Sequence, residues 1–238
     1  MCLIAWNWQP GEQHELLLVA NRDEFHARPA ETAHVWEGGH ILAGKDLQGG
    51  GTWLGLSHSG RFAALTNHRN PGLARVGTPT RGQLVTGFLH STLTGSEYLA
   101  HVAFDAGLYN PFNLLVFDGL QLLGFESRHG RTLVMDRGLG AVSNADFHTP
   151  WPKLVKLQAR LGECVSEQDT GNRALLALLA DKAVARDADL PATGLPLDRE
   201  RALSAAFIAT AGYGATSSSD CVFSIKKYIV WDTLALLM

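Results

Sequence analysis

Cys2 is the residue near the start of the chain that is best suited to covalent chemistry, and it follows Met1 directly. Removal of Met1, which a small residue at position 2 permits, leaves a thiol and a free α-amino group on one residue. Such an amino group has a pKa of about 7.7–8.0, so it can accept the thiol proton near neutral pH. The alternative interpretation is that Cys2 is a small apolar residue that begins a buried strand. The sequence supports both interpretations.

A polar run of four residues, Asn21-Arg22-Asp23-Glu24, ends the apolar stretch 16–20. If the strands expected at 2–8 and 14–21 form a hairpin, the end of the second lies beside the start of the first. Arg22 and Asp23 then lie close to Cys2, where an arginine favours the thiolate and an aspartate orients the amine. A solvated loop can also carry four such residues, and the position at a strand end favours the first interpretation.

The elements that must position these residues follow from the pattern of apolar residues and turns. Apolar strand-like segments lie near both ends of the chain, and most of the helix-like segments lie between them. The expected strands are 2–8, 14–21, 53–57, 61–66, 112–117, 120–126, 131–135, 138–143 and 206–209, with further strands within 221–231. The expected helices are 80–91, 150–161, 171–185 and 198–203. Because a sheet that is apolar on both faces must be covered on both, this order predicts an α+β fold with two stacked sheets covered by helices.

Composition excludes several classes of protein. The chain has 238 residues, 46% of them hydrophobic and 18% charged, which predicts one globular domain over residues 1–238. A net charge of −3 argues against nucleic-acid partners, and no apolar window reaches the ~18 residues of a membrane span. The three cysteines show no metal-ligand spacing, so we expect no metal, no cofactor and a reducing location, the cytoplasm or an organelle matrix. The oligomeric state stays open.

Several motifs together resemble those of the NRDE family, which is also called the transport and Golgi organisation protein 2 family. The family takes its name from an Asn-Arg-Asp-Glu run about twenty residues after an amino-terminal Met-Cys. Further motifs appear in the family's order: Gly50-Gly51-Thr52-Trp53-Leu54-Gly55, Ala64-Leu65-Thr66-Asn67, Tyr109-Asn110-Pro111-Phe112-Asn113-Leu114, Ser143-Asn144, Thr149-Pro150-Trp151-Pro152-Lys153 and Leu190-Pro191 through Phe207-Ile208. The resemblance spans nearly the whole chain.

The NRDE family is in turn remotely similar to choloylglycine hydrolases and penicillin V acylases, which are cysteine N-terminal-nucleophile amidases with a four-layer αββα sandwich. The resemblance implies that fold here, with five catalytic residues: Cys2 as nucleophile, Arg22 and Asp23 as its electrostatic partners, and Asn67 and Asn144 near the oxyanion and the amine. We further expect substrate contacts from Asn21, Glu24 and Trp53. An amide at Asn67 aimed at the oxyanion contributes ~3 kcal/mol, although asparagines after strands are commonly turn formers.

The chain departs from the family pattern near its end. The family tends to show Tyr-Gly-Thr-Arg, whereas this chain has Thr216 at the position of the arginine, with Lys226 and Lys227 as possible substitutes. The principal hypothesis is a cysteine hydrolase that cleaves the carbon-nitrogen amide bond of a small substrate. The missing arginine motivates the alternative, a non-enzymatic protein that binds or carries haem or an acyl lipid, and members of the family have been linked to haem movement and lipid traffic. The scattered histidines offer no paired haem ligands.

Overall fold

The computed structural model describes residues 2–224 and 229–235, and it describes side chains up to Ser219. The chain divides into two compact units, each built from separate stretches of sequence. The first unit contains residues 1–27, 69–72 and 136–238, and the second contains 28–68 and 73–135. Met1, Lys226 and Lys227 lie outside the described residues, and the prediction of one domain stays a prediction.

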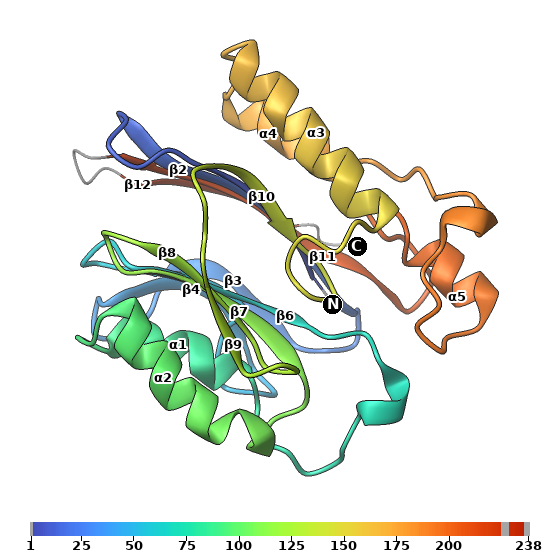
Figure 1. Ribbon diagram of the computed structural model, residues 1–238, viewed down its shortest axis with the longest axis horizontal. Coiled ribbons are helices and arrows are strands. Elements are labelled where there is room, and N and C mark those ends of the chain that lie inside the picture. Colours follow the sequence, from blue (N-terminus) through green and yellow to red (C-terminus); the bar gives the residue numbers. More distant parts are fainter. Residues whose placement is uncertain (1, 225–228, 236–238) are drawn as a thin grey trace. The chain divides into compact units, whose positions relative to one another are not determined.

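The first unit contains a five-stranded antiparallel sheet with helices along one face (Figure 1). In spatial order its strands are β10 (Gly138–Val142), β1 (Cys2–Trp8), β2 (His14–Phe25), β11 (Tyr213–Ser224) and β12 (Ile229–Ala235). Its helices are α3 (Pro152–Ser166), α4 (Asn172–Leu179), the 3-10 helix η3 (Asp187–Asp189) and α5 (Leu197–Ala202). The predicted hairpin at the start of the chain is confirmed as β1–β2, and its second strand runs on through the polar quartet.

Alternation along β1 and β2 decides which side chains face the helices. The core between this sheet and its helices consists of Leu3, Ala5, Leu17, Val19, Ala141, Leu154, Leu157, Leu161, Leu175, Leu178, Leu179 and Ala206. Because successive strand residues point to opposite faces, Cys2 and its partner Arg22 belong to the face away from these helices. Asp23, the next residue along β2, belongs to the helix side.

The second unit contains a seven-stranded antiparallel sheet that is also covered by helices on one face (Figure 1). Its strands in spatial order are β3 (Ala30–Val35), β4 (Ile41–Asp46), β5 (Leu54–Ser57), β6 (Phe62–Asn67), β7 (Phe112–Phe117), β8 (Leu122–Glu126) and β9 (Arg131–Val134). Its helices are α1 (Gly82–His90), α2 (Gly95–Asp105) and the 3-10 helix η2 (Ala106–Leu108), while η1 (Pro71–Leu73) spans the boundary between the units in sequence. The strands expected at 53–57, 61–66, 112–117 and 120–126 are confirmed as β5 to β8 and pair in antiparallel order, whereas β3, β4 and α2 were not predicted.

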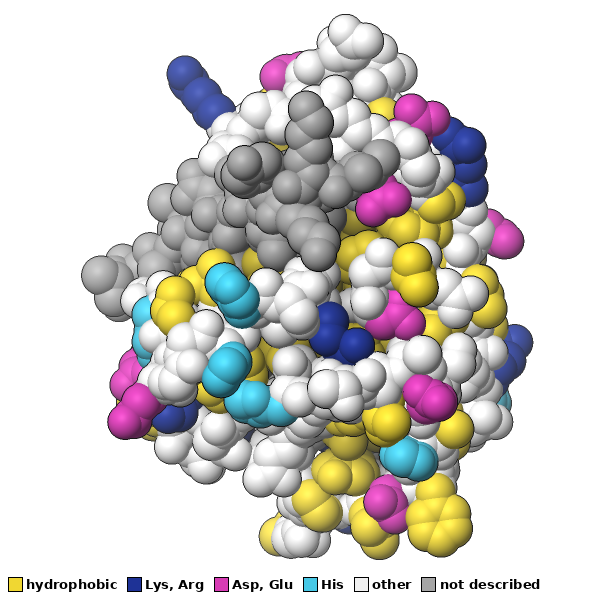
Figure 2. Space-filling view, turned by 90° about the vertical axis from the view of Figure 1, so that its left-hand side faces the viewer, with side chains coloured by type: hydrophobic (Ala, Val, Ile, Leu, Met, Phe, Trp, Pro, Cys, Tyr) yellow, Lys and Arg dark blue, Asp and Glu magenta, His cyan; other side chains and the backbone are white. Residues whose placement is uncertain are grey.

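The distribution of charge on the surface and the length of the helices bear on the class of partner. On the face drawn in Figure 2, the coloured lysine and arginine side chains lie among acidic ones and do not gather into one basic area. Within the described residues, none of the helices combines the length and the apolar character that crossing a membrane requires.

Candidate active site

Strand pairing places Cys2 between two polar segments. Cys2 lies opposite Arg22 in the β1–β2 ladder, and two residues later Ile4 lies opposite Val142 at the end of β10. The segment that follows β10, which carries Asn144, is therefore also close to Cys2. Since Cys2 is only 5% exposed, the thiol lies in a dry environment. The expected proximity of Arg22 and Asp23 to Cys2 is confirmed.

The thiol of Cys2 is not activated by its surroundings alone. Burial, and to a smaller extent the charge of Asp23, raise its pKa from 9.0 to about 11, although the guanidinium of Arg22 opposes this rise. At neutral pH the side chain is therefore a neutral thiol. Nucleophilic chemistry at Cys2 needs a base that removes this proton.

Arg22 is held in place by its neighbours on β2 and β11. Its Nη1 donates a hydrogen bond to Thr216 Oγ1 at 3.0 Å, and its Nη2 lies 3.6 Å from Glu24 Oε2. Thr216 Oγ1 also donates to the backbone oxygen of Arg22 at 3.2 Å. Thr216 lies at an irregularity in the β2–β11 ladder, between Ala215 and Ser217. The residue at the position of the family's arginine therefore contacts the guanidinium beside Cys2.

Asp23 is buried completely, and groups from several elements surround it. Tyr213 on β11 donates its hydroxyl to the backbone oxygen of Asp23 at 2.9 Å. Lys153 Nζ on α3 lies 3.8 Å from Asp23 Oδ2. Burial raises the pKa of the Asp23 carboxyl, and the charge of Lys153 is the strongest influence that opposes this rise. The ionised carboxylate therefore depends on nearby positive charge.

Asn144 is a further polar residue beside Cys2 in the first unit, and it is fully buried. Ser143 Oγ lies 3.2 Å from the backbone oxygen of Cys2 and 3.3 Å from Asn144 Oδ1, and can donate to either. The backbone N–H of Arg69 donates to the backbone oxygen of Asn144 at 2.6 Å. These bonds fix the segment after β10 against the start of β1.

Asn21 makes contacts that tie parts of the first unit together. Its Nδ2 donates to the backbone oxygens of Leu179 and Ala206 at 2.9 and 2.8 Å, and its Oδ1 accepts from Ser218 Oγ at 2.6 Å. The side chain is fully buried. This geometry holds the end of α4 and residue 206 against β2, whereas the expected contact of Asn21 with a substrate stays a prediction.

Two of the predicted site residues belong to the second unit. Asn67 is the last residue of β6 and pairs with Phe112, and Trp53 directly precedes β5. Both are partly buried. The first unit thus brings together Cys2, Arg22, Asp23, Glu24 and Asn144, while the roles of Asn67 and Trp53 stay predictions.

Two cations near Asp23 were not predicted as site residues. Lys153 lies in the Thr149–Lys153 motif, and this membership is the sequence signal that could have identified it as a site residue. Arg69 follows Asn67 by two residues. Arg69 Nη1 forms a buried ion pair with Glu200 Oε2 at 2.8 Å, and its guanidinium lies 4.5 Å from the ring centre of Trp151. Within the described residues no His, Cys, Asp or Glu side chains cluster in threes to hold a metal ion.

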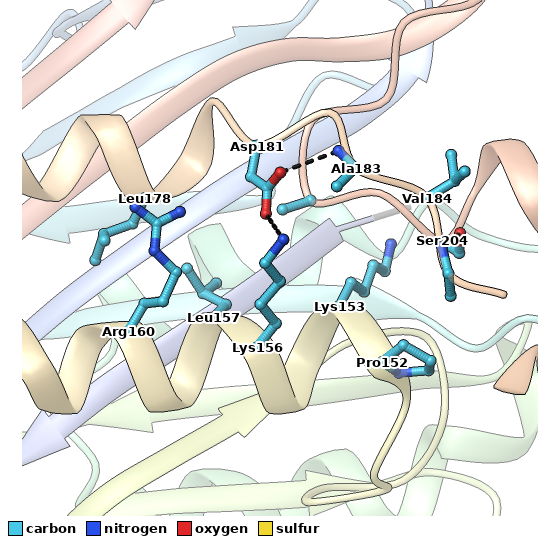
Figure 3. A pocket seen from close by; sticks show the side chains of 12 residues that line it. Pro152, Lys153, Lys156, Leu157, Arg160, Leu178, Asp181, Ala183, Val184 and Ser204 are labelled. Carbon is cyan, nitrogen blue, oxygen red and sulfur yellow. Dashed lines mark hydrogen bonds and ion pairs between the residues drawn. The ribbon is translucent and has the colours of Figure 1, made fainter.

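A small pocket of about 80 Å³ lies on the helix side of the first unit (Figure 3). Lys153, Lys156 and Arg160 line it from α3, and Asp181 lines it from the segment after α4. Lys156 Nζ forms an ion pair with Asp181 Oδ2 at 2.5 Å, and Asp181 Oδ1 accepts from the backbone N–H of Ala183. The pocket therefore borders the lysine that contacts Asp23.

Comparison with solved structures identifies a fold relative. The structure matches a Caenorhabditis elegans N-acylethanolamine-hydrolyzing acid amidase ortholog with a TM-score of 0.58 and 10% identity, over 99% of this chain and 100% of that one. At this identity the match shows the fold alone. It confirms the predicted fold class, an α+β fold of the N-terminal-nucleophile hydrolase type.

Sequence comparison finds relatives among curated proteins. The human Transport and Golgi organization protein 2 homolog is 36% identical over 206 residues, which cover 80% of this chain and 74% of that protein. The bovine homolog is 39% identical over 168 residues, and this match spans 60% of its length. The family model described as Transport and Golgi organisation 2 matches residues 1–228. This chain therefore belongs to the Transport and Golgi organisation 2 family, the family that its Cys2 and Asn21–Glu24 motifs predicted.

Proposed function

We propose that this protein is a cysteine N-terminal-nucleophile hydrolase that cleaves the carbon-nitrogen amide bond of a small substrate. The observation that carries the proposal is the placement of Cys2 at the start of β1, opposite Arg22 and next to the buried Asp23. The fold relative supports it at the level of architecture. We further propose a reducing location, the cytoplasm or an organelle matrix, where the thiol stays available.

The proposed reaction begins when removal of Met1 exposes the α-amino group of Cys2. This amine takes the thiol proton, which a thiol with a pKa near 11 does not release by itself at neutral pH. The sulfur attacks the amide carbon, and the resulting ammonium returns a proton to the departing amine as the carbon-nitrogen bond breaks. Water then attacks the thioester while the amine takes a proton from this water. The carbon-sulfur bond breaks, the ammonium returns the proton to the sulfur, and the acid departs from the regenerated Cys2 thiol.

The polar residues have separate roles in this proposal. Arg22 stabilises the thiolate by its charge, and Asp23 and Asn144 orient the amine. Asn67 supplies a donor to the oxyanion, which is worth ~3 kcal/mol when such a donor is well placed. Trp53 and Glu24 contact the substrate. The orientation of the amine by Asp23 requires the ionised carboxylate.

The substrate class can be screened with simple acyl amides. The nematode fold relative is named for the hydrolysis of N-acylethanolamines, so these amides form a reasonable first panel. Short acyl amides extend the panel. Release of the free amine is measured for each compound.

The test uses Cys2→Ala and a thiol-reactive acyl probe on protein whose intact mass shows that Met1 is absent. We expect the probe to add one acyl group at Cys2 in the unaltered protein and none in the variant, with equal circular dichroism spectra. Cys164→Ala is the matched control, since Cys164 is a second free cysteine that is partly buried. Labelling that persists in Cys2→Ala and disappears in Cys164→Ala would contradict the proposal.

The alternative, a non-enzymatic carrier of haem or an acyl lipid, rests on Thr216 at the position of the family's arginine. A carrier should bind its ligand equally well with and without Met1, because it does not need the free amine. Haem titration of both forms, followed by lipid extraction, measures this directly. Saturable binding by both forms together with an unreactive Cys2 would favour the carrier.

A further inference from the structure

Lys153 is a buried cation that the proposed reaction does not yet use. It is the second residue of α3, and its side chain is 1% exposed, whereas the side chain of Lys156, three residues later on the same helix, is 51% exposed. In Figure 3 both side chains extend from α3 toward the segment that contains Ala183. Burial of an ammonium is costly unless a counter-ion offsets it. Lys153 therefore needs a partner of opposite charge.

That partner is Asp23. The distance from Lys153 Nζ to Asp23 Oδ2 is 3.8 Å, and the Asp23 side chain is 0% exposed. Among the described residues, Lys153 Nζ has no hydrogen-bond partner. Asp181, the acidic residue that lines the neighbouring pocket, is paired with Lys156. The charge of Lys153 is thus directed at Asp23.

Other charged and titratable groups surround Asp23 from each packed element. They are Cys2 on β1, Arg22 and Glu24 on β2, Tyr213 on β11, Lys153 on α3, and Arg69 with its partner Glu200. Arg69 is compensated by Glu200 at 2.8 Å, and Arg22 has Glu24 at 3.6 Å. Lys153 is therefore the cation whose partner in this cluster is Asp23 itself.

Lys153 also carries the charge at neutral pH. Burial lowers its pKa from 10.5 to about 8, and the charge of Asp23 opposes this fall. A lysine with this pKa is mainly protonated at pH 7. Its charge favours the carboxylate form of Asp23, which burial alone disfavours.

We propose that Lys153 is a positioning residue that keeps Asp23 ionised, so that Asp23 can accept hydrogen bonds from the amine of Cys2. The ionisation of Asp23 is a property of the folded protein. The second step, the effect on Cys2, rests on the proposed hydrolase function.

The first experiment measures the ionisation of Asp23 by the pH dependence of its ¹³C carboxyl resonance in the full chain. Asp23→Asn assigns the resonance. We expect the unaltered protein to show ionised Asp23 at pH 7. In Lys153→Met the midpoint of the Asp23 titration should rise by about one to three pH units, and in Lys153→Arg the midpoint should stay at its original pH. Lys156→Met, the same change on the exposed lysine one turn away, is the control and should leave it unmoved.

Two outcomes would overturn the proposal. The first is a protonated Asp23 at pH 7 in the unaltered protein. This result would contradict the proposal even if Lys153→Met does not fold. The second is a folded Lys153→Met protein in which Asp23 titrates as before. A structural role of Lys153 lowers stability without moving this titration.

The second experiment follows acyl-probe labelling of Cys2 between pH 5 and 9. The labelling rate should fall on the acidic side of its pH profile. In Lys153→Met the pH of this fall should rise by the same number of pH units as the Asp23 titration, and Lys153→Arg should retain the original profile. A profile that does not move with Asp23 would refute the positioning role. If no form of the protein is labelled at Cys2, the proposed hydrolase function fails, whereas the titration still tests the coupling of Lys153 to Asp23.

Discussion

At the scale of single residues, the main feature is the number of ionisable groups in dry surroundings. Cys2, Arg22, Asp23 and Lys153 are all buried. Burial favours the neutral form of each ionisable group, and opposite charges restore ionisation where they lie close enough. The charge state of the site is therefore a collective property of these residues.

Burial of the Cys2 thiol should make the free energy of unfolding depend on pH in the alkaline range. The unfolded chain loses this proton near pH 9, whereas the folded protein keeps it until about pH 11. The folded state thus binds more protons in this window, so stability falls as pH rises, by about 2–3 kcal/mol in total. Below pH 9 the thiol is protonated in both the folded and the unfolded state, so its full contribution to stability is retained.

Urea unfolding at pH 8 to 11 under reducing conditions checks this prediction. Cys2→Ala should lose this part of the pH dependence, while Cys164→Ala should retain it. Equal slopes for the unaltered protein and Cys2→Ala would show that the thiol is not buried in the folded state.

At the scale of elements, local sequence signals explain α2, a helix that the apolar pattern did not predict. Thr94 Oγ1 accepts from the backbone N–H of Glu97 at 3.3 Å, and Glu97 Oε2 accepts from the backbone N–H of Thr94 at 2.9 Å. This reciprocal pair is a capping box, which satisfies donors that the first turn leaves without partners. A Thr-x-x-Glu search would have found this helix.

Thr94→Ala should lower the free energy of unfolding by about 1 kcal/mol, because the first turn of α2 loses its cap. The exposed Thr92, two residues earlier, provides the matched control, and Thr92→Ala should change stability by less than about 0.5 kcal/mol. Urea denaturation of both variants measures the difference. Equal loss in the two variants would contradict the capping role.

At the scale of the whole molecule, residues far apart in sequence are needed to complete the first unit. The short stretch 69–72 joins this unit although the residues on both sides belong to the other one. Arg69 reaches Glu200 at 2.8 Å, with side-chain exposures of 3% and 4%. An ion pair this buried leaves a costly charge behind when one partner is removed.

Arg69→Met should therefore lower the free energy of unfolding by about 3–5 kcal/mol, because it leaves Glu200 buried without its cation. The double variant Arg69→Met/Glu200→Gln should lose less than the sum of the single changes. Arg186→Met, which breaks an exposed pair with Asp189, is the control and should leave the free energy of unfolding nearly unchanged. Additive losses at Arg69 and Glu200 would show that the two residues do not interact.

The sequence by itself determined the β1–β2 hairpin, the helical segments α1, α3 and α5, the family and the fold class. These features depend on periodicity, turn residues and motifs, which are local in the chain. The hairpin alone is enough to place Arg22 and Asp23 beside Cys2, because a turn sets the register of the two strands that it joins.

Only the tertiary structure decided which residues control the charge of that site. α3 brings Lys153 to Asp23 across 130 positions of sequence, and β11 brings Thr216 to Arg22 across 194. The predicted helix 171–185 ends at Leu179, and Asp181 beyond it pairs with Lys156. No local pattern encodes such contacts, since they arise when helices pack on the sheet and bury charges together.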